Sequence, residues 1–243
     1  MRKREKLRLI KLYLAYHLNK TFLIIIGLLS ILLIIVLCVN LGLPLNKAEY
    51  LENTAFYHIN YLDQSIYIIN IVNSVIIAAL IGNEINSISS FDPMFISHVK
   101  RSKLISSKII TNIILILFIF LFEFCLMYLL GVIFYSNFVF TIKDLLIFGY
   151  LMLYFIQLIL IGELLSIIIN NFFVTIFIFL FSFIVNILSK IENLKKYIYM
   201  FFPFIEINSI NNYKLNLNVP IFLIFNILCY LVILILFEKK DIC

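Results

Sequence analysis

The chain has 243 residues, of which 64% are hydrophobic and 13% are charged. Soluble domains carry about 45–50% apolar and about 25% charged residues. These proportions exclude a soluble globular domain, because the polar groups are too few to cover a surface that faces water. They exclude intrinsic disorder for the same reason. We therefore expect the lipid bilayer to be the main solvent of this chain.

Long apolar runs predict six membrane-spanning helices in a single transmembrane domain, 1–243. Each spanning helix needs about 20 mostly apolar residues, which leaves no room for a folded domain outside the membrane. The runs are apolar on every face, which excludes the alternating pattern of barrel strands. The predicted spans cover residues 21–43, 64–83, 109–135, 145–168, 172–188 and 219–237. The turn between spans four and five is expected at Asn170-Asn171, with Gly162-Glu163 as the alternative.

The distribution of Lys and Arg predicts the orientation, because basic residues accumulate in cytoplasmic loops. Seven basic residues precede the first span, four lie between Lys100 and Lys108, and two follow the last span, against six on the other side. Both termini are therefore expected to be cytoplasmic. The net charge of +6 arises from this excess and suits an anionic inner leaflet, so it requires no nucleic acid.

The sequence carries no motif for chemistry of its own. It lacks the Gly-x4-Gly-Lys-Ser/Thr loop that binds ATP, and it lacks the signatures of metalloproteases and serine hydrolases. The three histidines lie at or outside the span boundaries on both sides of the membrane, and the four cysteines have no metal or redox spacing. We expect no catalytic residue, no metal and no cofactor on this chain.

Polar residues inside the spans need partners, because an ionisable group in the bilayer costs several kcal/mol unless it is paired or protonated. Glu123 lies near the middle of span three with no Lys or Arg expected at its depth, so we predict a protonated, hydrogen-bonded carboxyl. It is either structural or part of a substrate path. Glu163 is expected to be solvated or near the end of span four.

Spans two and five carry polar stripes that either join helices or line a translocation path. The stripes consist of Asn70, Asn73 and Ser74, and of Thr175, Ser182 and Asn186.

The loop 84–108 follows span two and contains a predicted short helix. Asp92-Pro93 is a helix start, with Asp as N-cap and Pro at the first helical position. The helix that follows places Phe95, Ile96 and Val99 on one side, with basic residues after it. Such a helix at the inner face of the membrane suits contact with a soluble partner, although a helix that only lies on the surface has the same pattern.

These features resemble the permease subunits of type-2 ATP-binding-cassette exporters. Those permeases have six spans, an interfacial helix before the first span, an acidic residue and a coupling helix after the second, and an Arg and a Lys leading into the third. Glu84, Arg101 and Lys108 occur here in that order, and residues 6–20 look like the interfacial helix. Gly162–Ser166 at the end of span four is also similar. The chain departs from the family at the Gly and Pro that often flank the coupling helix.

The segment 189–218 looks like the external, hairpin-like segment that precedes the last span in this family. Its apolar run Tyr197–Phe204 is too short to cross a membrane and too apolar to lie in water. We expect this run to dip into the outer leaflet, with Lys195 and Lys196 at the headgroups. It would either cap the exit of a substrate path or anchor the segment at the interface.

The resemblance implies an all-α protein of the bacterial plasma membrane that works with partners. Two permease chains, identical or different, would enclose a path, and separate ATPase subunits would carry ATP and Mg. The cargo would be a hydrophobic or amphipathic peptide, toxin or antibiotic, because the length is similar to that of small permeases for antimicrobial-peptide export or immunity. The residues expected to couple to the ATPase are Glu84, Phe95, Val99, Arg101 and Lys108. The residues expected on the translocation path, or as intramembrane polar groups, are Glu123, Asn73, Ser182 and Asn186.

Two alternatives remain open from the sequence. The first is the substrate-binding membrane subunit of an importer that also borrows an ATPase; the basic N-terminal helix and the coupling-type loop favour the exporter. The second is a membrane enzyme or an anchor, which would need a reactive group of residues or a docking domain, and neither is visible.

Overall fold

The computed structural model describes residues 9–15, 54–83, 100–134, 142–169, 171–188, 204–209, 212–216 and 218–239, with isolated positions at 27–31 and 191–202. Nearly all of the predicted first span, and the predicted coupling helix with Glu84, Phe95 and Val99, lie outside the described residues.

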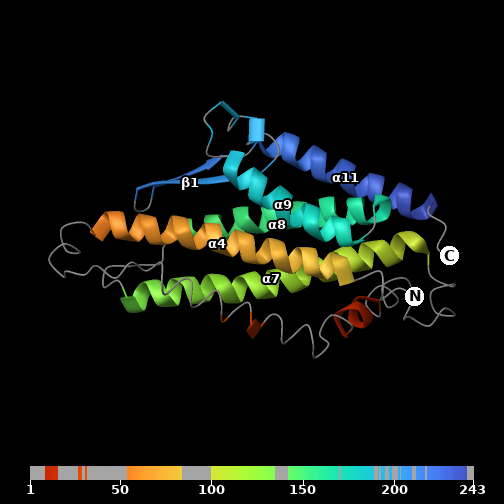
Figure 1. Cartoon of the computed structure of the whole chain (residues 1–243), viewed down its shortest axis with the longest axis horizontal. Coiled ribbons are helices and arrows are strands. Elements are labelled where there is room, and N and C mark those ends of the chain that lie inside the picture. Colours follow the sequence, from red (N-terminus) through yellow and green to blue (C-terminus); the bar gives the residue numbers. More distant parts are fainter. Residues whose placement is uncertain are drawn as a thin grey trace.

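Five long helices make up most of the described fold (Figure 1). Their apolar sequences favour helices in lipid, because a helix pairs its own backbone groups. Four contain a stretch that is long and apolar enough to cross a membrane, and α9 contributes the shorter apolar stretch Phe173–Val185. The helices are α4 (Thr54–Asn83), α7 (Arg101–Phe134), α8 (Ile142–Ile168), α9 (Asn171–Leu188) and α11 (Val219–Lys239).

Two of the helices begin earlier than the apolar runs predict. α4 begins at Thr54 rather than at 64, and α7 begins at Arg101 rather than at 109. Both extra segments carry charged residues, which end an apolar run without ending a helix. At about 1.5 Å per residue, the 34 residues of α7 reach roughly 50 Å, which exceeds the ~30 Å of a bilayer core. The basic start of α7 is therefore longer than a crossing requires.

α8 ends at Ile168 and α9 begins at Asn171, so the chain turns between these two helices. This is the turn that the sequence favoured. The alternative turn at Gly162-Glu163 does not occur, because both residues lie inside α8.

The buried core lies between the helices in two adjoining parts. The larger part packs α4, α7, α8 and α9 together around side chains such as Ile69, Phe120 and Phe155. The smaller part joins the start of α7 to the last turns of α8 and α11, and Leu9 of the N-terminal helical segment belongs to it. Figure 1 shows the resulting antiparallel arrangement, in which α7 begins at the end of the bundle where α8 and α11 finish.

A two-stranded antiparallel hairpin interrupts the helical fold between α9 and α11. Strands β1 (Phe204–Ser209) and β2 (Asn212–Asn216) pair Phe204 with Asn216 and Ile207 with Tyr213. Isoleucine alternates with polar residues in β1, which favours a strand over a membrane helix. The hairpin falls within the predicted external segment 189–218, so the expected all-α class holds with this one addition.

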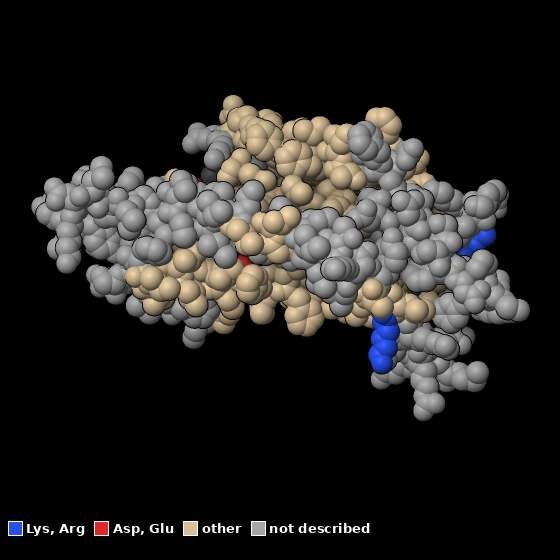
Figure 2. All heavy atoms as spheres, turned by 60° about the horizontal axis from the view of Figure 1, so that its bottom comes forward, with Lys and Arg blue, Asp and Glu red and all other residues tan. Residues whose placement is uncertain are grey.

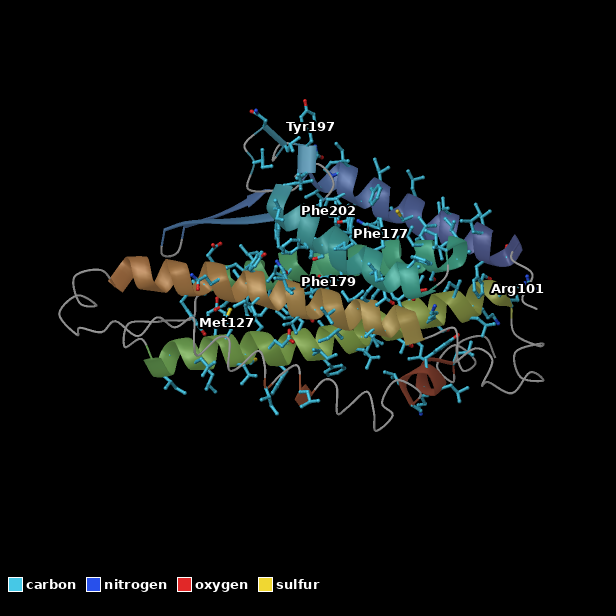
Figure 3. The ribbon with its side chains drawn as sticks, in the orientation of Figure 1. Arg101, Met127, Phe177, Phe179, Tyr197 and Phe202 are labelled. Carbon is cyan, nitrogen blue, oxygen red and sulfur yellow. The ribbon has the colours of Figure 1, made fainter. Side chains whose placement is uncertain are left out.

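The apolar residues before the hairpin partly pack on the bundle. The ring of Phe202 lies 5.5 Å from that of Phe181 on α9 and 6.4 Å from that of Tyr154 on α8. Tyr197 points away from the helices and is 64% exposed (Figure 3). Phe202 therefore packs the segment against α8 and α9, whereas Tyr197 lies on the outer surface of the protein.

Side chains of α4 and α9 pack closely against α8 at Gly162. A Cβ atom at this position would meet the side-chain ends of Ile81 and Ile178, the latter at 2.6 Å. We expect Gly162→Leu to lower the free energy of unfolding by about 1–3 kcal/mol, because the added side chain overlaps the packed ends of Ile81 and Ile178 and must displace them. Thermal unfolding of the purified chain measures this. Gly149→Leu is the control, because Gly149 has nothing within 4 Å of its Cβ position. Equal losses from both variants would contradict the packing role of Gly162.

Candidate functional site

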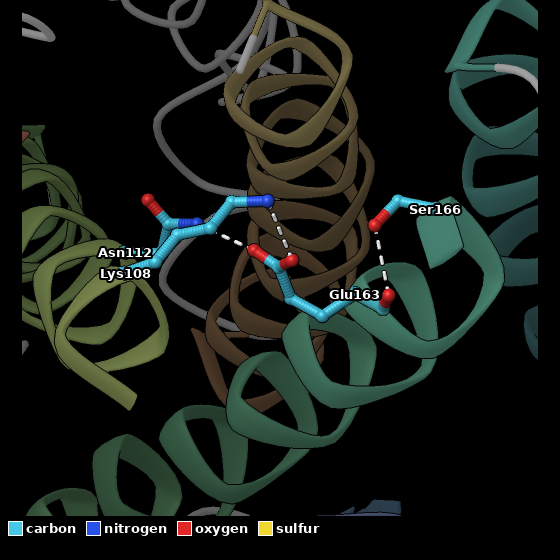
Figure 4. A network of polar contacts seen from close by, with 4 residues as sticks. All are labelled: Lys108, Asn112, Glu163 and Ser166. Carbon is cyan, nitrogen blue, oxygen red and sulfur yellow. Dashed lines mark hydrogen bonds and ion pairs between the residues drawn. The ribbon is translucent and has the colours of Figure 1, made fainter. Parts of the chain in front are cut away.

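The first buried polar group joins α7 to α8 and consists of Lys108, Asn112, Glu163 and Ser166; we call it the Lys108 cluster (Figure 4). Lys108 Nζ donates to Glu163 Oε2 at 2.8 Å, and Asn112 Nδ2 donates to Glu163 Oε1 at 3.0 Å. The Ser166 hydroxyl donates to the backbone oxygen of Glu163 at 2.8 Å. Both carboxylate oxygens of Glu163 thus accept hydrogen bonds from α7.

Helix geometry places these side chains together. Lys108 and Asn112 are one turn apart on α7, so both point toward the same stretch of α8. The side chains of Lys108 and Glu163 are 5% and 0% exposed. A buried ion pair of this kind adds little net stability, but removal of one partner leaves an uncompensated charge. The cluster therefore links α7 to α8 through polar contacts at one position along the two helices.

The sequence did not predict this pair. Glu163 is predicted to be solvated or to lie near the end of span four; it does lie near the end of α8, but the structure buries it fully and gives it a cation. Lys108 was singled out only for its place before span three. The two residues are 55 positions apart, so no spacing rule connects them.

The second buried polar group joins α4, α7, α8 and α9 and consists of Asn73, Ser74, Glu123, Tyr154 and Ser182; we call it the Glu123 cluster. Asn73 Nδ2 donates a short hydrogen bond to Glu123 Oε2 and a second bond to the backbone oxygen of Ile69, at 3.0 Å. The hydroxyl oxygen of Ser182 lies 2.6 Å from that of Ser74 and 2.9 Å from that of Tyr154.

The polar stripes of spans two and five therefore meet. Asn73, Ser182 and Glu123 are each no more than 1% exposed, and each forms a hydrogen bond to a neighbouring helix. In this conformation they join helices, which is one of the two roles expected from the stripes. The side chain of Asn186, the remaining candidate for a translocation path, is not among those that the structure describes.

Tyr154 and Gln157 on α8 are polar side chains that the sequence analysis missed. Their side chains are 2% and 0% exposed, and Tyr154 extends the Glu123 cluster to α8. The signal was present, because the two residues are three positions apart and share a helical face. Tyrosine contributes to an apolar run like other aromatic residues, so the run does not reveal its hydroxyl group.

Basic residues gather at the end of the bundle where α7 begins. Arg101 Nη1 donates to the backbone oxygen of Glu238 at 3.2 Å, which caps the end of α11, and the hydroxyls of Ser106 and Tyr230 lie 2.8 Å apart. Figure 2 shows blue side chains at this right-hand end. The basic residues of the described segments at this end are Lys11, Lys100, Arg101, Lys103 and Lys239. At the other end the described elements carry Lys143 and Lys214 together with Asp63, Asp144 and Glu206.

Comparisons of the chain with protein-family models, curated proteins and solved structures find no match. Within the described segments, no group of three or more His, Cys, Asp or Glu side chains is placed to hold a metal ion. The features that bear on function are thus the basic end of the bundle and the two buried polar clusters behind it.

Proposed function

We propose that this chain is the permease subunit of an ATP-driven exporter in a bacterial plasma membrane, and that a separate ATPase supplies the energy. The observation that carries the proposal is the buried ion pair between Lys108 and Glu163, close behind the basic end of the bundle. The pair connects the helix that follows the predicted coupling loop to the interior of the bundle.

α7 is placed to transmit motion from the predicted coupling loop into the bundle. This helix begins at Arg101, immediately after the loop that carries Phe95 and Val99. A displacement of the loop by a docked ATPase would move the start of α7 as a stiff rod. Because Lys108 is tied to Glu163, α8 must follow or the ion pair must break, which has a large energetic cost. The pair thus gives the partner's motion a route into the bundle.

The remaining contacts at this end favour a single docking surface. The N-terminal segment 9–15, the start of α7 and the end of α11 share one buried cluster that includes Leu9, Leu104 and Phe237. A force on any of these elements therefore reaches the others. The excess of basic residues at this end favours its placement in the cytoplasm, where the ATPase would bind.

The rest of the mechanism follows the exporter scheme. A second permease chain completes the path, ATP and Mg bind to the ATPase, and a hydrophobic or amphipathic peptide, toxin or antibiotic leaves outward. Glu84, Phe95 and Val99 contact the ATPase from the coupling loop, and Arg101 and Lys108 pass the motion into α7. The chain changes conformation when the nucleotide binds elsewhere, and it performs no catalysis itself.

The test is whether a P-loop ATPase copurifies with this chain. We expect the two proteins to purify together from the membrane. Phe95→Asp should lower their affinity at least about tenfold, because a charge enters the apolar side of the coupling helix, and a tenfold loss corresponds to about 1.4 kcal/mol. The permease should stay in the membrane in normal amounts.

Ser97→Asp is the matched control for this experiment. It adds the same charge to the same loop, but its helical position lies opposite Phe95 and Val99. Equal binding of the ATPase to the wild type and to Phe95→Asp would overturn the docking role of the loop. A purified chain that transports without any ATPase would overturn the proposal itself.

A further inference from the structure

The contact between Glu123 and Asn73 leaves two acceptor atoms without a donor. Both side chains are fully buried. Among the groups that the structure describes, Glu123 Oε1 and Asn73 Oδ1 have no hydrogen-bond partner. Buried acceptors in proteins are nearly always satisfied, so a specific pair of orphaned oxygens on two bonded side chains requires an explanation.

The donors of Asn73 are already used. One amide hydrogen goes to Ile69 O and the other to Glu123 Oε2. Reversing the amide would place its oxygen against two other acceptors, which is repulsive. Asn73 therefore cannot donate to Oε1. If Glu123 were ionised, Asn73 would offer its buried charge only one neutral hydrogen bond.

We infer that Glu123 and Asn73 form an intramembrane proton-binding site whose proton holds α4 against α7. A proton on Glu123 Oε1 turns that oxygen into a donor and removes the buried charge. The added hydrogen is then available to the amide oxygen of Asn73, the other unsatisfied acceptor of this pair. One proton thus accounts for both orphaned atoms, and this inference does not depend on the exporter function.

No described cation is placed to neutralise Glu123 instead. Lys108 is engaged by Glu163 and, at about 1.5 Å per residue, lies roughly 22 Å along α7 from Glu123. Asp63 on α4 is exposed, and the described segment of α9 carries no charged residue. Two tyrosines on the packed helices already have partners. The Tyr61 hydroxyl donates to Met127 O at 2.6 Å, and the Tyr154 hydroxyl is hydrogen-bonded to that of Ser182. The other titratable residues on these helices are Tyr57, His58, Tyr67, Arg101, Lys103, Cys125, Tyr128, Lys143, Asp144, Tyr150 and Glu163.

A metal cation fits the site less well than a proton. Hard cations take about six or more oxygen ligands. The pair itself offers only Glu123 Oε1 and Asn73 Oδ1, since Oε2 already accepts from an amide. A proton needs two oxygens, one to carry it and one to accept the hydrogen bond.

Loss of the proton would loosen the bundle at this point. An ionised Glu123 must gain water or a cation, and water reaches it only if α4 and α7 separate. Asn73 is next to Ser74, which contacts Ser182 on α9. Release of the proton would therefore disturb the contacts of α4 with α7 and α9 together.

Infrared spectroscopy of the full chain in lipid vesicles tests the site directly. At neutral pH exposed carboxyls are ionised. We expect the wild type to show the carbonyl stretch of a protonated carboxylic acid, and Glu123→Gln to lose it. The control variant, Lys108→Met with Glu163→Gln, removes the other buried acid of the described helices and should retain the band. Asn73→Leu should shift the band to higher frequency, because a hydrogen bond to the acid is lost.

Three results would overturn the inference. The first is the absence of a protonated-acid band from the wild type at neutral pH. The second is a band that persists unchanged in Glu123→Gln. The third is a band that appears only when Na⁺ and K⁺ are removed, which would make the site a cation site. If Glu123→Gln fails to fold, alkaline titration of the wild type replaces it: the band should disappear reversibly, and a band that survives until the protein unfolds would count against proton exchange at this site.

Discussion

Lys108→Met is expected to lower the free energy of unfolding by about 3–5 kcal/mol, because it leaves the Glu163 carboxylate buried without its cation. Asn112 would remain as a neutral donor to Glu163, and a neutral hydrogen bond does not replace a charge. The measurement is unfolding of the purified chain in detergent micelles by a chemical denaturant. Lys100→Met is the control, since Lys100 is exposed.

The double variant Lys108→Met with Glu163→Gln separates the charge effect from lost packing. Removing both charges removes the desolvation cost as well, so most of the stability should return. A double variant as unstable as the single one would show that the contact contributes through shape, and that the ion pair does not carry the connection between α7 and α8. The double variant should also show weaker coupling to the ATPase even though it is stable, because the fastening point is gone.

Glu123→Lys is expected to destabilise the chain by several kcal/mol, whereas Glu123→Gln should cost less than about 1 kcal/mol. Glutamine keeps the volume and can still accept from Asn73, and its amide hydrogens add donors to a pair that has two unsatisfied acceptors. Lysine brings a charge that no described acid is placed to neutralise. The amount of folded protein in the membrane and its thermal unfolding measure both effects.

Glu238→Lys is the matched control, because it makes the same substitution at an exposed position. It should change stability by less than about 0.5 kcal/mol. Equal losses from Glu123→Gln and Glu123→Lys would contradict a neutral carboxyl, because only an ionised group would be harmed by the loss of its charge in glutamine. The two clusters thus respond to opposite changes: the Lys108 cluster requires both charges or neither, and the Glu123 cluster requires neutrality.

The approximate positions of the helices can be read from the amino-acid sequence alone. Apolar runs without charges located α8, α9 and α11 to within a few residues, and Asn170-Asn171 was the favoured turn. The same method placed the starts of α4 and α7 too late, because charged residues end an apolar run but do not end a helix. Hydropathy is a local property that each segment carries regardless of its neighbours, which is why it can be read before the fold is known.

Which helix faces meet depends on how the helices pack. In the most apolar stretch of α11, 11% is buried, whereas in that of α4, 61% is buried. Both stretches nevertheless have the composition of a membrane span. Lipid and protein interior are equally apolar, so composition cannot distinguish the face that packs from the face that meets lipid. Lys108 and Glu163 are 55 positions apart in the sequence, and Asn73 and Glu123 are 50 apart. Each pair forms only if its two helices cross at the right point with the right faces turned toward each other. Packing sets that rotation, and close contacts such as the one at Gly162 exist only once the helices are together.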